Sequence, residues 1–392
     1  MRVVMVQKTA SLSGGGDQHC FGLADALTHL GHEVRFLSTS DERNLVDEGV
    51  FVPVTVTHAS REALPVAAQA AVFSRALWNA SAAEGTRRLI AEFRPDVVHT
   101  HKLYPQLSVA PVVVAARAGV PVVQTLHDFE MISASPIDAR GGFWDRDETR
   151  FRFRLLNSAL RPVQRFVHAP RVTAFIAVSR FVARVHAKYG IHATVLPNFV
   201  PPGDGQALPG FDERKGAVFL GRLQPEKGAL DVVELAKRVP GIPVTVVGSG
   251  DLEPSIRSAA LNIPNLRVAG FVSDPELRET LRRARVVVIP SRCQDAGPLV
   301  PLEAMANATP VVAYAMGGLS EYVTDSGGGR VVPVDVEALA AATADLHDDR
   351  VLWERHSERA RVAVVERHTP AVYAERVVKI YESVVDGVRG SR

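Results

Sequence analysis

The chain has 392 residues, 46% of them hydrophobic, and its 45 basic residues nearly balance 43 acidic ones. This length suits two domains with a core each, and a net charge of +2 argues against nucleic acid as the main partner. Cys20 and Cys293 lack metal-type spacing, which argues against a disulfide framework or a zinc site. No apolar run has the length of a signal peptide or a membrane span. A cytoplasmic location is therefore expected.

Short β-branched runs alternate with helical segments along the chain. Strands are predicted in the first half at 2–6, 33–39, 95–101, 121–126 and 172–179, with a helix from about Asp17 to Leu30 after the first. The predicted strands of the second half are 216–221, 243–248, 266–271, 285–291 and 309–315, with a weak strand at 330–334. Helices are predicted last, at 335–349, 351–368 and 369–385.

The predicted strands are apolar throughout, as parallel strands are when helices cover both faces of a sheet. The fold class is therefore α/β, with two Rossmann-like, doubly wound domains expected to face each other across a cleft. A stretch rich in proline and glycine, Asn198–Gly216, is the best linker candidate. We expect domains at 1–200 and 201–370, with the C-terminal helix, about 371–392, packing back on the first.

Ligands of such sheets bind beyond the carboxyl ends of the strands, so the residues that follow each strand matter most. Arg222 and Lys227 follow one strand and enter a helix. They could clamp a diphosphate or belong to an ordinary solvated loop. Gly248 and Gly250 follow the next strand. Their lack of a side chain would allow a close ligand, although a tight turn explains them equally well.

The densest stretch follows the strand at 285–291. Asp295 and Glu303 flank a helix start there, where backbone N–H groups face any anion above the helix. Pro298 is expected at a first helical position. The two carboxylates could instead merely stabilise the helix.

This stretch, PSRCQDAGPLVPLEAMANATPVVAYAMGGLSEYV, resembles the signature of glycosyltransferase family 4, whose members are retaining enzymes of GT-B fold. GRLQPEKG is similar to the family's GR-x-x-x-x-KG element, SGGGDQH to its N-terminal glycine loop, and TLHDF to its histidine-bearing strand end. These motifs occur in the family's order over most of the chain. Each is weak alone, and the ordered set is specific.

The resemblance implies a role for each matching residue. Arg222 and Lys227 would hold the diphosphate, Glu303 would accept hydrogen bonds from the ribose, and Asp295 and His127 would contact the donor sugar. The remaining donor-binding positions that it implies are Gly15, Gly16, Gly248, Gly250, Phe271, Val272, Pro298, Leu299 and Val300.

The chain departs from the family pattern at three places. Asp295 is one methylene shorter than the usual glutamate, and Ala296 and Gly297 replace a small-aromatic pair. These changes put the choice of donor sugar, or the activity itself, in doubt. Ala308 stands where the family usually has glycine.

Three other features concern the acceptor side, metal binding and the protein surface. His99, His101 and Lys102 follow the apolar run PDVV at 95–98 and are acceptor-side candidates. Asp145 and Asp147 form an Asp-x-Asp pattern outside the strand context that metal binding needs, so no metal is expected. The predicted helix Arg150–Arg165 gathers arginines on one face, and apolar residues that include Phe166 just beyond it lie on the opposite arc. This pattern indicates a solvated face over a packed core or a peripheral contact with an anionic membrane.

The motifs and the family resemblance that they carry together predict a metal-independent, retaining glycosyltransferase without a cofactor. Its donor would be a nucleotide diphosphate sugar, with UDP favoured, and its acceptor a hydroxyl of a saccharide, a lipid-linked glycan or a small metabolite. A nucleotide-sugar epimerase or hydrolase of the same fold and a non-catalytic nucleotide-sugar-binding subunit remain open. The sequence does not identify the acceptor or the oligomeric state.

Overall fold

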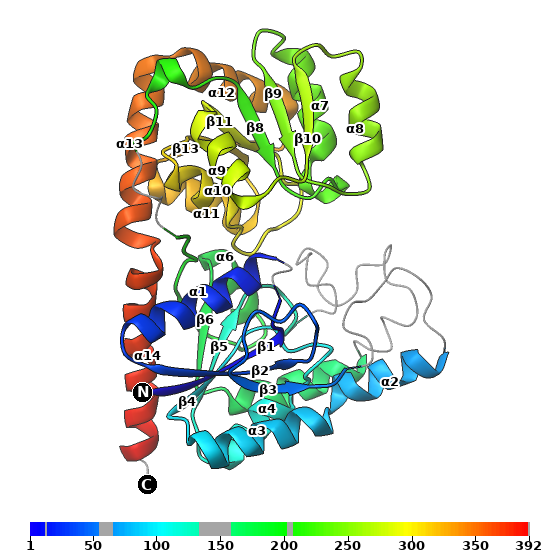
Figure 1. Ribbon diagram of the computed structural model, residues 1–392, viewed down its shortest axis with the longest axis vertical. Coiled ribbons are helices and arrows are strands. Elements are labelled where there is room, and N and C mark those ends of the chain that lie inside the picture. Colours follow the sequence, from blue (N-terminus) through cyan, green and yellow to red (C-terminus); the bar gives the residue numbers. More distant parts are fainter. Residues whose placement is uncertain (12–13, 55–65, 133–157, 202–206, 391–392) are drawn as a thin grey trace. The chain divides into compact units, whose positions relative to one another are not determined.

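The computed structural model describes residues 1–11, 14–54, 66–132, 158–201 and 207–390. The chain forms two compact units: unit 1 comprises Met1–Pro197 and Pro370–Arg392, and unit 2 comprises Asn198–Thr369. Each unit contains one sheet with helices on both faces (Figure 1). Among the described helices, none is long and apolar enough to cross a membrane.

Unit 1 has a seven-stranded parallel sheet in the order β3-β2-β1-β4-β5-β6-β7. Its strands are β1 (Arg2–Thr9), β2 (Glu33–Thr39), β3 (Gly49–Val52), β4 (Val97–Thr100), β5 (Val122–Leu126), β6 (Ala174–Ala177) and β7 (Ala193–Val195). The predicted strands of this half are confirmed. The sequence missed β3 and β7, which are short and pair along one side only, at the edges of the sheet.

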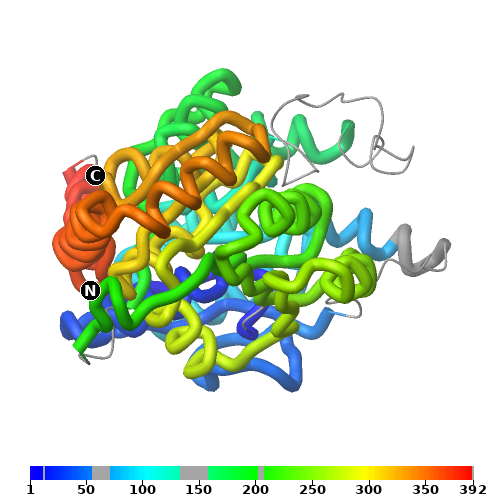
Figure 2. The backbone as a smooth tube through the Cα atoms, turned by 90° about the horizontal axis from the view of Figure 1, so that it is seen from above, coloured from blue at the N-terminus to red at the C-terminus, as the bar shows by residue number. Residues whose placement is uncertain are grey.

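The described helices of unit 1 are α1 (Gly15–His29), α2 (Val66–Leu77), α3 (Ala80–Phe93), α4 (Ala110–Arg117), α6 (Arg180–Ala187) and α14 (Pro370–Gly390). The last helix, α14, packs on α1, and Figure 2 shows it in red beside the blue N-terminal segment. Buried Tyr373 and Tyr381 belong to its packed face. The segment after unit 2 therefore completes the core of unit 1.

Unit 2 has a six-stranded parallel sheet in the order β10-β9-β8-β11-β12-β13. Its strands are β8 (Ala217–Leu220), β9 (Val244–Val247), β10 (Leu266–Gly270), β11 (Val286–Ile289), β12 (Val311–Tyr314) and β13 (Gly329–Val332). Its helices are α7 (Ala229–Arg238), α8 (Glu253–Ala260), α9 (Asp274–Arg283), α10 (Val300–Ala306), α11 (Gly317–Ser326), α12 (Val336–Asp348) and α13 (Arg350–Arg367).

Strand β11 explains why the apolar runs have no polar alternation. Val286 and Val288 belong to a core cluster that includes residues of α7, α8 and α12. Val287 and Ile289 belong to a second cluster, with residues of α10, α11 and α13. Because successive side chains of a strand point to opposite faces, a strand covered on both sides is apolar at most of its positions.

Two local expectations were wrong. Helix α10 begins at Val300, so Pro298 precedes it and Pro301 takes the proline position of the first turn, where the backbone has no intrahelical use for an N–H. Phe166 was expected on an apolar helix face, but it is 68% exposed in a π-helical turn over Val163–His168. Most of the predicted arginine helix and the Asp145–Asp147 pattern lie outside the described residues.

Ala308 shows why the family prefers glycine at this place. Its backbone φ is +52°, in the left-handed region that disfavours a Cβ by roughly 1–2 kcal/mol. The residue turns the chain from α10 into β12, and its carbonyl accepts a hydrogen bond from Ser357 Oγ at 2.7 Å. This turn therefore carries local strain that a glycine would relieve.

We predict that Ala308→Gly costs about 1 kcal/mol less stability than Ala341→Gly, because relief of strain offsets the lost methyl group and the added chain entropy. Ala341 is the matched control, an exposed residue inside α12, where glycine costs about 1 kcal/mol. Midpoints of urea unfolding of both variants and the parent measure the difference. Equal losses at the two positions would contradict the strain assigned to Ala308.

Candidate functional site

The candidate residues of unit 2 gather at the carboxyl ends of β8, β9 and β11. The parallel register pairs β8 with both β9 and β11, so the loops that follow these strands start at the same edge of the sheet. Three loops meet there: 221–228 after β8, 248–250 after β9 and 290–299 after β11. The sequence predicted each of these loops as a ligand-binding candidate.

Lys227 and Asp295 form an ion pair at this edge, between Nζ and Oδ1. Ser291 Oγ donates a hydrogen bond to the other carboxylate oxygen, Oδ2, at 2.7 Å. The two side chains are 22% and 16% exposed, so solvent screens this pair less than a surface pair. Both oxygens of Asp295 therefore have partners, and one of them is the cation expected to bind a diphosphate.

A second contact joins the same two loops and was not anticipated from the sequence. The carbonyl of Glu226 accepts hydrogen bonds from the backbone N–H groups of Arg292 and Cys293, at 2.9 and 3.1 Å. The Arg292 guanidinium donates two hydrogen bonds to Asp231, at 2.8 and 3.0 Å, and Tyr314 donates a third. Bidentate pairing of this kind restricts geometry, so the loop that carries Lys227 is held against the loop that carries Asp295.

Arg222 stands on the same loop as Lys227 and is far more exposed. Its side chain is 60% exposed, and its ion pair with Glu226 spans 3.7 Å. Such a pair contributes little. The guanidinium can therefore turn toward an anion at small cost.

Glu303 lies in the first turn of α10 and is half-buried. Desolvation and the nearby charge of Asp274 raise the pKa of its carboxyl group to about 7. The hydrogen bonds formed by Glu303 with described residues use its backbone atoms. Its carboxylate is therefore a half-buried acceptor with capacity for donors from outside the protein, such as hydroxyl groups.

The glycines of this edge are explained by close packing of the loops themselves. A Cβ on Gly248, whose φ is +132°, would lie 1.9 Å from the carbonyl oxygen of Gly221. A Cβ on Gly317 would lie 2.5 Å from the carbonyl oxygen of Asp295. The tight-turn interpretation of Gly248 therefore suffices without a ligand.

One further contact holds the loop at 290–299. Asn198, which is buried, donates a hydrogen bond from Nδ2 to the carbonyl of Gly297 at 2.7 Å. Sequence reasoning missed this contact, because no local pattern marks it. At the end of β10, Phe271 is 83% exposed and Val272 is half-buried.

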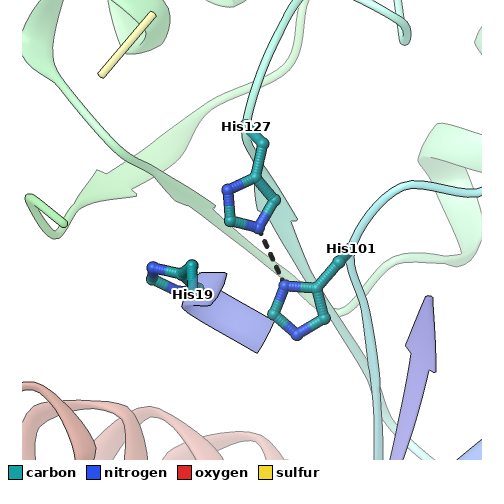
Figure 3. Close-up of side chains that lie close together, drawn as sticks. All are labelled: His19, His101 and His127. Atoms are coloured by element: carbon teal, nitrogen blue, oxygen red, sulfur yellow. Dashed lines mark hydrogen bonds between the residues drawn. The ribbon is translucent and has the colours of Figure 1, made fainter. Parts of the chain in front are cut away.

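A second group of candidates lies in unit 1, at the ends of β4 and β5. His101 follows β4 and His127 follows β5, and the register that pairs Thr100 with Gln124 brings these ends together. His101 Nδ1 and His127 Nε2 are 2.8 Å apart and share a hydrogen bond (Figure 3). His19, from α1, is the third ring of the group, with its centroid 4.8 Å from that of His127. We call these residues the histidine cluster.

Burial keeps His101 and His127 of the histidine cluster uncharged. It lowers the pKa of both residues well below the usual value. Neighbouring imidazoles lower both pKa values further, and Lys102 also lowers that of His127. Each residue of the cluster offers one ligand atom, and these three atoms lie within 4.8 Å of one another. Neutral imidazoles in such a group could bind a transition metal. Sequence reasoning missed His19, which the glycine loop places at this edge.

The remaining candidates of unit 1 adjoin the cluster. Lys102 Nζ forms an ion pair with Asp128 at 3.2 Å. Gly15 and Gly16 open α1, and a Cβ on Gly16 would lie 3.0 Å from Cε of Lys102. The glycine loop therefore lies directly against the lysine. His101 is 1% exposed, so any effect of its side chain on a ligand must pass through neighbouring residues.

Comparisons with known proteins cover both units. Residues 13–203 match the family model described as Glycosyltransferase Family 4, and residues 206–363 match the one described as Glycosyl transferases group 1. A phosphatidyl-myo-inositol mannosyltransferase of Mycolicibacterium smegmatis is 27% identical over 98% of this chain and 94% of that protein. A glycogen synthase of Mycobacterium tuberculosis is 27% identical over 99% of this chain and 96% of that protein.

Solved structures resemble the whole chain. Sucrose-phosphate synthase from Thermosynechococcus elongatus has a TM-score of 0.70 at 19% identity and covers 98% of this chain and 99% of its own. Anabaena Alr3699/HepE in complex with UDP has a TM-score of 0.67 at 16% identity, with coverage of 98% and 100%. These likenesses confirm the GT-B fold class, with a Rossmann-like sheet in each unit. The matches to both halves show that the chain belongs to glycosyltransferase family 4 and is a glycosyltransferase.

Proposed function

We propose that the protein transfers a glycosyl group from a nucleotide diphosphate sugar to a hydroxyl acceptor, with retention of the anomeric configuration and without a metal ion. One observation carries this proposal. At one sheet edge of unit 2, Lys227 and the exposed Arg222 share a loop, and the half-buried side chain of Glu303 lies in the first turn of α10. Cations suit a diphosphate, and a carboxylate suits the hydroxyl groups of a ribose.

The ion pair of Lys227 gives donor binding a defined order of events. An incoming diphosphate competes with Asp295 for the ammonium group, and the diphosphate carries the larger negative charge. When Lys227 turns to the phosphate, Asp295 loses its strongest partner and becomes an acceptor for sugar hydroxyls. Thus one exchange of partners neutralises the leaving group and frees the carboxylate that contacts the sugar.

Two charges develop in the reaction and must be stabilised, a positive charge on the sugar ring and a negative charge on the diphosphate. As the bond between the anomeric carbon and the phosphate oxygen breaks, negative charge grows on the diphosphate, where Arg222 and Lys227 lie. The acceptor oxygen forms the new bond on the same face of the sugar, and its proton passes to the departing phosphate oxygen. His127 contacts the donor sugar in this proposal. The two cations serve the purpose that a divalent metal serves in other transferases.

The relatives suggest the chemical class of the substrates. A solved structure similar to this chain contains UDP, so UDP-sugars are the first donors to test. Relatives of similar length are named for transfer to phosphatidyl-myo-inositol and for glycogen synthesis, so lipid-linked and saccharide acceptors come first. Exposed Phe166 beside Arg165 is consistent with peripheral membrane contact by a cytoplasmic enzyme.

We predict that one nucleoside diphosphate and its sugars raise the melting temperature of the protein selectively, and that transfer of the sugar persists in excess chelator.

Lys227→Ala should lower kcat/KM by about 10²–10³-fold, the usual loss for a group that stabilises transition-state charge. Lys237→Ala is the matched control, a lysine on the surface of α7 that pairs with Glu234. Thermal shift and a radiolabelled transfer assay measure these effects.

Other outcomes of this assay assign other functions. Strict dependence on manganese would contradict the metal-free mechanism. Donor turnover without any acceptor would indicate the epimerase or hydrolase, and donor binding without turnover would indicate a binding subunit. In the last case, activity gained by Asp295→Glu would identify the shortened side chain as the cause.

The raised pKa of Glu303 predicts a pH dependence of donor binding. A ribose hydroxyl donates a stronger hydrogen bond to the carboxylate than to the protonated acid, so affinity should rise as pH increases through about 7 and level off above it. Glu303→Gln should bind the donor more weakly and lose this dependence, because an amide does not titrate. Calorimetric titration with the nucleoside diphosphate between pH 6 and pH 8.5 provides the measurement.

Asp274→Asn tests the assignment of this titration. Its charge is one cause of the raised pKa of Glu303, so its removal should move the midpoint of the affinity curve to lower pH. Persistence of the same curve in Glu303→Gln would place the titrating group elsewhere, for instance on a phosphate of the ligand.

A further inference from the structure

His101 is buried and shares a hydrogen bond with His127. The direction of this bond determines which ring nitrogen of His127 is protonated. Burial keeps both rings neutral, so each imidazole has one N–H donor and one acceptor nitrogen. The bond of 2.8 Å between His101 Nδ1 and His127 Nε2 therefore has two possible directions. In each direction, the tautomers of both rings are set together.

The opposite side of His101 decides between the two directions. Its Nε2 is buried and has no hydrogen-bond partner among the described residues. If His127 donated, the proton of His101 would have to be on Nε2, as a buried N–H group without an acceptor. If His101 donates, its Nε2 is an unprotonated acceptor. Buried N–H groups without a partner are rarer in proteins than under-used acceptors, which favours donation by His101.

The ring of His101 is also prevented from turning. It stacks on His99, with centroids 4.4 Å apart. His99 is held at both nitrogens, by Tyr381 of α14 at 2.6 Å and by Thr125 of β5 at 2.8 Å. A ring packed in this way keeps its donor nitrogen aimed at His127, as Figure 3 shows.

We infer that His101 is a positioning residue: it donates its Nδ1 hydrogen to Nε2 of His127 and thereby fixes His127 with its own proton on Nδ1. In Figure 3 the second nitrogen of His127 points away from His101. This N–H group is thus a neutral hydrogen-bond donor directed at a substrate oxygen. That last step rests on the proposed function, in which His127 contacts the donor sugar. The tautomer itself does not depend on it.

The tautomer can be read directly in the free protein. The full chain is labelled with ¹⁵N-histidine, and long-range ¹H–¹⁵N correlation spectra are recorded at pH 8, with the His127 signals identified by their loss in His127→Gln. The expected spectrum has His127 Nδ1 protonated and Nε2 unprotonated. A proton on Nε2 of His127 would overturn the inference.

Two variants separate positioning from general damage to the fold. His101→Leu removes the donor, so the His127 signals should move toward a mixture of tautomers. His186→Leu is the matched control: this histidine of unit 1 is also fully buried, and its Nδ1 bonds to the carbonyl of Val182. The control should lose stability but keep the His127 spectrum of the parent. Equal spectral changes in both variants would contradict a specific role for His101.

Kinetics test the consequence for transfer. His101→Leu should lower kcat by roughly 10–100-fold, because misplacing one catalytic contact has costs of this size, while KM for the donor changes by less than about threefold. His101→Asn can present an amide N–H near the position of Nδ1 and should recover part of the loss. If His127→Gln transfers sugar at the normal rate, the proposed contact of His127 with the substrate is wrong, whereas the spectrum still decides the tautomer.

A metal ion is the competing occupant of the histidine cluster. If the purified protein retained a stoichiometric transition metal, and a chelator shifted the His127 signals, a metal would replace the hydrogen between the two rings. That result would overturn the tautomer assigned above. Equal spectra with and without chelator, and no retained metal, would support it.

Discussion

Parallel strand pairing is the constraint on which both candidate sites depend. In each sheet the register brings the carboxyl ends of neighbouring strands to one edge, so residues distant in sequence meet there. Because helices cover both faces, the strands are mostly apolar, and the candidate polar residues gather in the loops at their carboxyl ends. His101 and His127 meet for this reason in unit 1, and Lys227 and Asp295 in unit 2.

Polar groups at these edges are used by the protein before any ligand binds. Lys227 is paired with Asp295, Lys102 with Asp128, and His127 with His101. A ligand must therefore replace an existing ion-pair or hydrogen-bond partner of these side chains. Its binding free energy is the difference between the contacts it forms and the contacts it breaks. Glu303 differs from these residues, because burial and Asp274 raise the pKa of its half-buried carboxyl group to about 7.

The fold was predictable from the sequence because repeated apolar runs indicate buried parallel strands. Strands β3 and β7 were missed since their short edge runs carry too little pattern, and Pro298 was misplaced because cap positions depend on local geometry. Motif order predicted the family, which the comparisons support. His19, Asn198 and Tyr381 escaped prediction because their partners lie far away in sequence. The roles given to Arg222, Lys227 and His127 stay predictions.

Helix α14 imposes an order on assembly during synthesis. It follows unit 2 in the chain, yet its Tyr381 closes on His99 in the interior of unit 1, and its Tyr373 lies against His19. The ribosome releases the N-terminal segment first. The histidines of that segment become fully buried only after α14 has been synthesised and has packed on unit 1. The contiguous residues of unit 2 can mature in the meantime. A nascent chain stalled before α14 would consequently expose apolar surface, which makes it a natural client for chaperones.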